Sequence, residues 1–176
     1  VDQEPHLEVA REIARKMNQT YGMDFPEPAR FTTPGEYIPS LTGEGKMSKT
    51  VSGSYINLTD SKEEVQKKVR SIPTATEAGG EITGGLKTLF MLGRIFIPDE
   101  TVKFKDSFMN GTLRFVDFKD ALSEAISKDL QPFQEKREQI SSATSYVDKV
   151  IKEGAEKARV IAKKTLHELK NKMGLS

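Results

Sequence analysis

Residues 41–53 read LTGEGKMSKTVSG, a stretch in which Lys46 and Lys49 stand three residues apart among glycines and hydroxyl side chains. Each lysine ends in a compact ammonium group on a flexible stem, so two of them can follow phosphate oxygens that shift during a reaction. Glycine on both sides lets the backbone approach a ligand closely. Phosphoryl and nucleotidyl transfer depend mainly on positioned positive charge. The stretch therefore predicts a polyphosphate-binding loop, and a solvated Lys-Ser loop is the plainer interpretation of any KxxK pattern.

Two motifs resemble class I aminoacyl-tRNA synthetases. Residues 46–50, KMSKT, are similar to the Lys-Met-Ser-Lys-Ser signature of that class, and threonine in the last place keeps the hydroxyl. Residues 1–8, VDQEPHLE, are similar to the Gly-x-Asp-Gln-x-x-His-x-Glu segment of tryptophanyl-tRNA synthetases, without its glycine. Segments 113–119, 130–137 and 153–158 also resemble that family, in its order. The resemblance covers essentially the whole chain.

The resemblance implies an aminoacyl-tRNA ligase that activates tryptophan with ATP and Mg²⁺ to an adenylate and then esterifies tRNA. The other signature of the class, His-x-Gly-His, does not occur, since the only histidines are His6 and His167. We therefore expect the C-terminal half of a longer enzyme, inactive by itself. The alternatives are a tyrosine-tRNA ligase fragment and a synthetase-derived RNA-binding module without catalysis.

Individual roles also follow from the resemblance. Lys49 is implied to stabilise the transition state, and Lys46 the departing pyrophosphate. Gln3 is implied to face the ammonium group of the amino acid. The implied ATP-binding residues are Val1 and Asp2 at the ribose, Ile38 at the adenine, and Lys46, Met47, Ser48, Lys49 and Thr50. No metal ligand from the protein is expected, because Mg²⁺ would arrive with ATP, and we expect His6 to have a hydrogen-bonded structural role.

Composition excludes several classes of protein. Lys plus Arg number 27 and Asp plus Glu 26, so the net formal charge is +1 and any nucleic-acid site must be a local patch. The absence of cysteine excludes disulfides, thiolate catalysis and the thiolate-bound iron-sulfur cluster of some relatives. No apolar run approaches the roughly 18 residues of a membrane span. We expect a soluble, cytoplasmic protein with no membrane partner.

Hydrophobic periodicity predicts a mainly α chain. The resemblance divides it into the remnant of the second half of a Rossmann-type catalytic domain, residues 1–58, and an α-helical, anticodon-binding-type domain, residues 59–176. Helices are expected at 4–19, 61–72, 86–97, 99–109, from about 118 with a kink at Pro132, and from about 145 to 173. Residues 23–58 are expected to be loop-rich, with short extended pieces at 36–38 and 55–58.

The last predicted helix has an apolar side and a basic side. The apolar side is expected to be buried, with the helix packing back on the catalytic part; its residues are Val147, Val150, Ile151, Ala155, Ala158, Ala162, Leu166, Leu169 and Met173. Small residues, including Gly154, indicate close helix contact.

Phosphate contact with tRNA is the function predicted for the basic side. Six cations against one anion between residues 157 and 172 make it a candidate surface, and a solvated helix face is the alternative. A weaker candidate for an RNA-binding surface consists of Lys62, Lys67, Lys68 and Arg70. The resemblance adds tryptophan-accepting tRNA and tryptophan as partners, and a homodimer.

Overall fold

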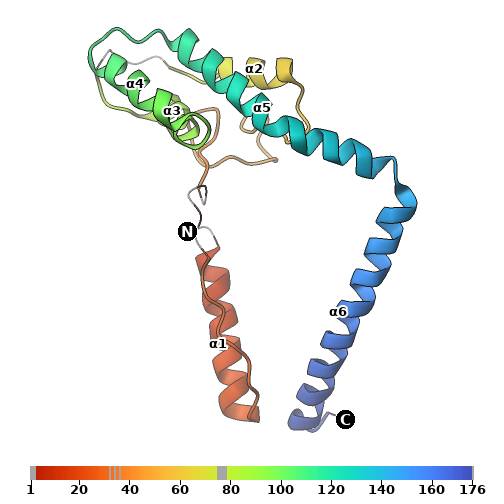
Figure 1. Cartoon of the computed structure of the whole chain (residues 1–176). Coiled ribbons are helices and arrows are strands. Elements are labelled where there is room, and N and C mark those ends of the chain that lie inside the picture. Colours follow the sequence, from red (N-terminus) through yellow and green to blue (C-terminus); the bar gives the residue numbers. More distant parts are fainter. Residues whose placement is uncertain (1–2, 32, 34, 36, 75–78, 176) are drawn as a thin grey trace. The chain divides into compact units, whose positions relative to one another are not determined.

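The computed structural model describes residues 3–31, 33, 35, 37–74 and 79–175. Within these ranges it contains six α-helices joined by irregular segments (Figure 1). They are α1 (Glu4–Tyr21), α2 (Lys62–Arg70), α3 (Gly84–Phe96), α4 (Pro98–Met109), α5 (Phe115–Ser141) and α6 (Thr144–Met173). The mainly α prediction is confirmed. The described parts of 36–38 and 55–58 form no named strand, residue 36 lies outside the description, and the extended pieces expected there stay a prediction.

Capping chemistry places several helix ends where the sequence predicts them. Gly22 ends α1 in the left-handed region, with φ at 62°. Two capping boxes are possible before α2, and the structure uses Ser61 with Glu64: the Ser61 hydroxyl accepts from Glu64 N–H at 3.2 Å, and the Glu64 carboxylate accepts from Ser61 N–H at 2.7 Å. Asp60 has another role, since its carboxylate accepts from Asn57 N–H at 2.7 Å.

The chain forms two compact units, which are described separately. One comprises residues 1–33 and 139–176, and the other residues 34–138. The two units are defined by contacts within the chain. They do not test the predicted domain division at residue 58, which stays a prediction. None of the described helices is long and apolar enough to cross a membrane.

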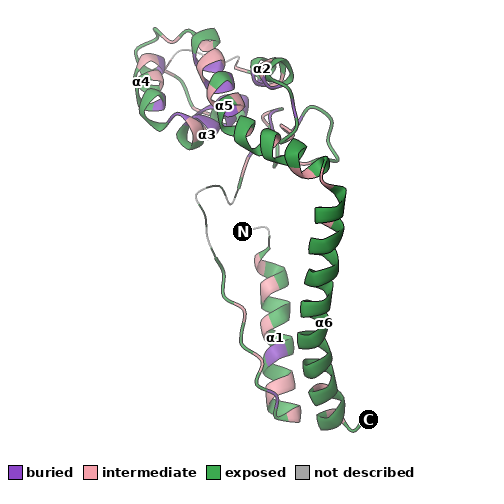
Figure 2. Ribbon diagram, turned by 45° about the vertical axis from the view of Figure 1, so that its right-hand side comes forward, coloured by how far each residue is buried: buried purple, intermediate pink, exposed green. Residues whose placement is uncertain are grey.

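The hydrophobic core lies in the unit of residues 34–138. Figure 2 shows buried residues gathered on α2, α3 and the first half of α5. The Phe118 ring stacks on Phe104 at 4.5 Å between centroids and contacts Phe90 at 5.2 Å. Gly93 allows this approach, because a Cβ there would lie 2.4 Å from Thr101 Oγ1 and 3.0 Å from Phe118 Cζ. The sequence correctly predicts α3 as a buried helix.

A buried lysine closes the C-terminal end of α2. The Lys119 ammonium donates to the carbonyls of Arg70 at 3.0 Å and Ile72 at 2.7 Å. Burial lowers the pKa of Lys119. The first bond satisfies a carbonyl that the end of a helix leaves without an intrahelical partner, the second binds the segment just after α2, and together they fix this end of α2 against α5.

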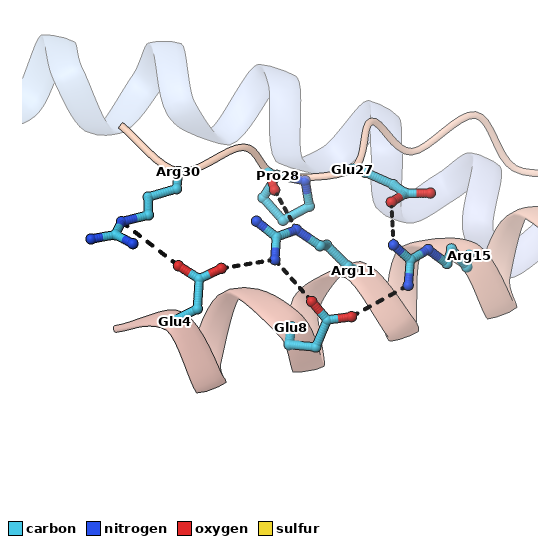
Figure 3. A network of polar contacts seen from close by, with 7 residues as sticks. All are labelled: Glu4, Glu8, Arg11, Arg15, Glu27, Pro28 and Arg30. Carbon is cyan, nitrogen blue, oxygen red and sulfur yellow. Dashed lines mark hydrogen bonds and ion pairs between the residues drawn. The ribbon is translucent and has the colours of Figure 1, made fainter. Parts of the chain in front are cut away.

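The other unit is held together largely by polar contacts. Figure 3 shows the carboxylates and guanidinium groups that join α1 to the segment after it. The residues of this polar network are Glu4, Glu8, Arg11, Arg15, Glu27 and Arg30, together with the carbonyl of Pro28. Arg11 donates to the Pro28 carbonyl at 2.9 Å, and Arg15 pairs with Glu27 at 2.7 Å. The C-terminal end of α6 lies beside that of α1, where the Lys172 ammonium donates to the Gly22 carbonyl.

The burial predicted for α6 is wrong for this structure. None of its residues is buried, and Figure 2 shows exposed residues along nearly its whole length. Of the nine residues predicted to be buried, only Val147, Leu169 and Met173 are half-buried. A Cβ on Gly154 would meet no described atom within 4 Å, so the close helix contact expected at this residue is absent from the described chain. The helix has the expected amphipathic pattern, and the described chain supplies a partner only near one end.

Candidate functional site

The KMSKT motif begins on one arm of a short hairpin. Met47 N–H donates to the Ile38 carbonyl at 2.8 Å, and Ser40 N–H donates to the Gly45 carbonyl at 3.0 Å. A single antiparallel bridge pairs Pro39 with Lys46. Hydrogen bonds on both sides of that bridge therefore fix the backbone of Lys46.

Helix α3 anchors this hairpin through two close contacts. The buried Thr88 hydroxyl donates to the Ser40 carbonyl at 2.9 Å. Gly43, with φ at 89°, lies so close to α3 that a Cβ would be 2.5 Å from Gly85 N. Only glycine combines that backbone conformation with that approach. The first arm of the motif is thus attached to the hydrophobic core.

The motif itself forms a turn organised by hydroxyl groups. The Ser48 hydroxyl accepts from Thr50 N–H at 3.3 Å and lies 2.8 Å from the Thr50 hydroxyl. Val51 N–H donates to the Ser48 carbonyl at 3.3 Å. A serine side chain that hydrogen-bonds the backbone two residues later stabilises a turn in place of helix or strand. Threonine in place of the signature's serine keeps this contact, because the hydroxyl is the group that is used.

The two lysines that the motif presents are exposed. Among the described residues, none forms an ion pair or hydrogen bond with the Lys49 side chain. An ammonium with no protein partner exchanges only water for a phosphate oxygen, so no existing ion pair has to break. The arrangement suits a polyphosphate better than a neutral ligand.

The side chains of Ile38 and Met47 face the core, unlike the two exposed lysines. Both are half-buried and pack against it. They line an apolar pocket with Ile56, Leu92 and Phe96, among others. The Ile38 carbonyl already accepts from Met47 N–H, so a further backbone contact at this residue would use its amide or the second lone pair of that carbonyl.

The other predicted site residues fall elsewhere. Val1 and Asp2 lie outside the described residues. Gln3 stands at the N-cap position of α1 in the other compact unit, without a side-chain capping bond, and His6 is exposed on that helix. The structure thus brings Ile38 together with the KMSKT motif, and the position of Gln3 relative to the lysines stays a prediction. In the described ranges, no three or more His, Cys, Asp or Glu residues cluster to hold a metal ion.

The weaker RNA-binding candidate on α2 loses most of its free charge. Lys62 pairs with Glu124 at 2.7 Å, Lys68 pairs with Asp60, and Arg70 makes two hydrogen bonds to Asp120 at 2.8 and 2.9 Å. Hydrogen bonding to Arg70 holds the pKa of Asp120 below its usual value. Three of the four cations in this candidate serve to hold α2 in place.

The basic side of α6 stays available. Its cations are all exposed, although Lys172 pairs with Glu168 at 3.1 Å and donates to Gly22. Lys157, Arg159, Lys163, Lys164 and Lys170 have no ion pair within the part of the chain that the structure describes.

The sequence gives no signal for two residues of the site. Thr88 looks like one polar position in an apolar helix, and Ser54 like one of several loop serines. Both are buried, at 0% exposed, and both hydrogen-bond to the hairpin or the motif. Buried hydroxyl groups are normally bonded, but a single sequence does not indicate their partners.

A lysine-bearing loop is thus fixed by hydroxyl groups and anchored on a helical core. The family model "tRNA synthetases class I (W and Y)" matches residues 1–131. The chain belongs to this family of class I tRNA synthetases, as the motifs predict.

Individual relatives agree with this assignment. The chain is 37% identical over 183 residues to the tryptophan-tRNA ligase of Porphyromonas gingivalis, covering 98% of this chain and 55% of that protein. The crystal structure of tryptophanyl-tRNA synthetase from Mycoplasma pneumoniae has the same fold, with a TM-score of 0.80 at 24% identity over 99% of this chain and 54% of that chain. The Campylobacter jejuni enzyme, complexed with ADP and tryptophan, gives a TM-score of 0.72 at 26% identity over 99% of this chain and 55% of that chain. The chain spans about half the length of the curated relatives it matches.

Proposed function

We propose that this chain is part of a tryptophan-tRNA ligase, which uses ATP and Mg²⁺ to form tryptophanyl-adenylate and then transfers tryptophan to tRNA. The observation that carries the proposal is the KMSKT turn with its exposed lysines, in a chain that belongs to this family. The names of the relatives favour tryptophan over tyrosine. The Campylobacter structure with ADP and tryptophan supports a nucleotide and an amino acid as ligands of the complete enzyme.

The proposed activation step joins a tryptophan carboxylate oxygen to the α-phosphorus of ATP and releases pyrophosphate. Lys49 stabilises the charge that develops in the transition state, and Lys46 binds the departing pyrophosphate. Ser48 and Thr50 hold the turn from which Lys49 projects. Mg²⁺ accompanies the triphosphate and is held by its oxygens rather than by side chains of this chain.

The remaining ligand contacts in the proposal come from backbone and from the start of α1. The backbone of Ile38 meets the adenine, beside the apolar pocket that its side chain lines. Met47 contributes its backbone to the nucleotide site, Val1 and Asp2 lie against the ribose, and Gln3 faces the ammonium group of tryptophan.

The proposed tRNA-binding domain is residues 59–176, with the catalytic part in residues 1–58. Support comes from the exposed cations of α6 that have no acidic partner. We also propose that the apolar side of α6 packs on the catalytic part of the full-length protein, because Ile151 and Leu166 are 64% and 50% exposed here. A homodimer and a cytoplasmic location, where tRNA and ATP are available, complete the proposal.

Pyrophosphate exchange tests this function. The full-length protein is expected to exchange labelled pyrophosphate into ATP when tryptophan is supplied, and much less with tyrosine. Addition of the other half of the enzyme to this 176-residue chain is expected to restore exchange in trans. RNA binding without tryptophan-dependent exchange in the full-length protein would contradict the proposal and favour a non-catalytic module.

A further inference from the structure

Ser54 closes the loop that carries Lys49. Its side chain is fully buried, with 0% exposed, although it lies in an irregular segment directly after three exposed residues. Its hydroxyl donates to the Ser48 carbonyl at 2.6 Å and accepts from Ser48 N–H at 3.2 Å. One side chain thus bonds both backbone groups of Ser48, as a neighbouring strand would.

The backbone of Ser54 extends the same closure to the hairpin. Leu41 N–H donates to the Ser54 carbonyl at 3.0 Å, and Ser54 N–H donates to the Val51 carbonyl at 3.2 Å. Leu41 is 1% exposed and belongs to the core. The seven-residue loop from Ser48 to Ser54 is therefore closed at its base and attached to the packed part of the unit.

We propose that Ser54 is a positioning residue for Lys49, and that its hydroxyl fixes the Ser48 peptide from which the catalytic lysine extends. This inference rests on the proposed function. Lys49 has an exposed and flexible side chain, so the position of its ammonium depends on its backbone. Each missing bond to Ser48 would let that backbone sample other positions, and a displacement of about 1 Å is enough to slow a reaction that needs exact alignment.

Ser54 differs from the residues of the motif in how it acts. Its side chain is buried, and its hydroxyl bonds only the backbone of Ser48 among the described residues. Ser52, two residues earlier, is an exposed serine of the same loop with no hydrogen bond to the described residues. Ser52→Ala is therefore a matched control for Ser54→Ala.

A double-mutant cycle in the full-length protein tests the inference. Ser54→Ala removes the partner of Ser48 N–H and one of the two donors to the Ser48 carbonyl, and we expect kcat for tryptophan-dependent pyrophosphate exchange to fall about tenfold, with little change in KM for tryptophan. In a Lys49→Ala background the same change is expected to cost less than about twofold, because there is no lysine left to position. Ser52→Ala is expected to leave the rate unchanged.

The outcomes separate this inference from the proposed function. Multiplicative effects of Ser54→Ala and Lys49→Ala, or an unchanged rate for Ser54→Ala, would overturn the positioning role while the proposed function stands. An inactive wild type would overturn both. If Ser54→Ala does not fold, Ser54→Cys keeps the size of the side chain with a weaker hydrogen bond and is expected to show the same coupling to Lys49. Hydrogen exchange at Ser48 N–H gives a readout without catalysis, and it is expected to be faster in Ser54→Ala than in Ser52→Ala.

Discussion

Two hydrophobic residues of α6 allow a direct test of what covers this helix. Ile151 is 64% exposed and Val160 is 70% exposed, so the described chain buries neither. They are nine residues apart, which at about 100° per residue places them on opposite sides of the helix. Ile151 shares its side with Leu169 and Met173, which are half-buried near α1. We expect the catalytic part of the full-length protein to cover Ile151 and to leave Val160 in water.

Asparagine at each position gives a matched pair, because isoleucine and valine have similar helix propensities. Burial of an isoleucine side chain stabilises a protein by about 1.5–3 kcal/mol, and a buried amide without partners costs about 1–3 kcal/mol more. Ile151→Asn is therefore expected to lower the free energy of unfolding of the full-length protein by about 3–5 kcal/mol. Val160→Asn is expected to change it by less than about 0.5 kcal/mol, as for an exposed site.

Denaturant unfolding of the two full-length variants, followed by circular dichroism, measures the difference. Equal effects of Ile151→Asn and Val160→Asn would refute the proposal that α6 packs by its apolar side. A large effect of Val160→Asn alone would show that the opposite side is covered.

Three further changes probe the unit that holds the motif. Gly43→Ala places a Cβ on a residue with φ at 89°, 2.5 Å from Gly85 N. We therefore expect denaturant unfolding to show a loss of more than about 2 kcal/mol in the free energy of unfolding. A neutral effect would contradict the anchoring of the hairpin. Phe118→Ala is expected to lower that free energy by about 3–5 kcal/mol, because this ring is fully buried, and a cost below about 1 kcal/mol would contradict its place in the core. Burial opposes the charged form of Asp60, but Lys68 and backbone N–H groups outweigh it and lower the Asp60 pKa, so its stabilisation is present above about pH 4 and is lost as the pH falls further. Asp60→Asn is therefore expected to cost about 1.5–3 kcal/mol at pH 7 and clearly less at pH 3, and an equal cost at both pH values would count against the ion pair.

Local chemistry accounts for the parts of the fold that the sequence predicts well. The Ser61–Glu64 capping box, the left-handed Gly22 and the apolar circumference of α3 depend on residues a few positions apart. Such interactions form within one segment, and their spacing in the sequence indicates them directly. The KMSKT motif is predictable for the same reason, because its residues are consecutive, but the sequence does not indicate the bonds that Ser54 makes to Ser48.

Contacts between distant segments explain the features of the fold that the sequence does not predict. The cations of α2 look free in the sequence, but Asp120 and Glu124 of α5 neutralise two of them, Arg70 from 50 residues further on and Lys62 from 62. Lys119 looks like a surface lysine and is buried, because the carbonyls it meets lie at and just after the end of another helix, about fifty residues earlier. Nothing in the spacing of these residues indicates which segments meet.

Prediction of burial on α6 fails for a different physical reason. Its amphipathic pattern correctly indicates which side is apolar, but amphipathicity does not say which segment covers that side. In the described residues only the end near α1 has a partner.

Steady-state exchange kinetics of Lys49→Ala in the full-length protein test the central claim most directly. If Lys49 stabilises the transition state of tryptophan activation, kcat for pyrophosphate exchange falls by about a hundredfold or more, while KM for tryptophan changes by less than about threefold. A rise in KM for tryptophan with an unchanged kcat would contradict the account.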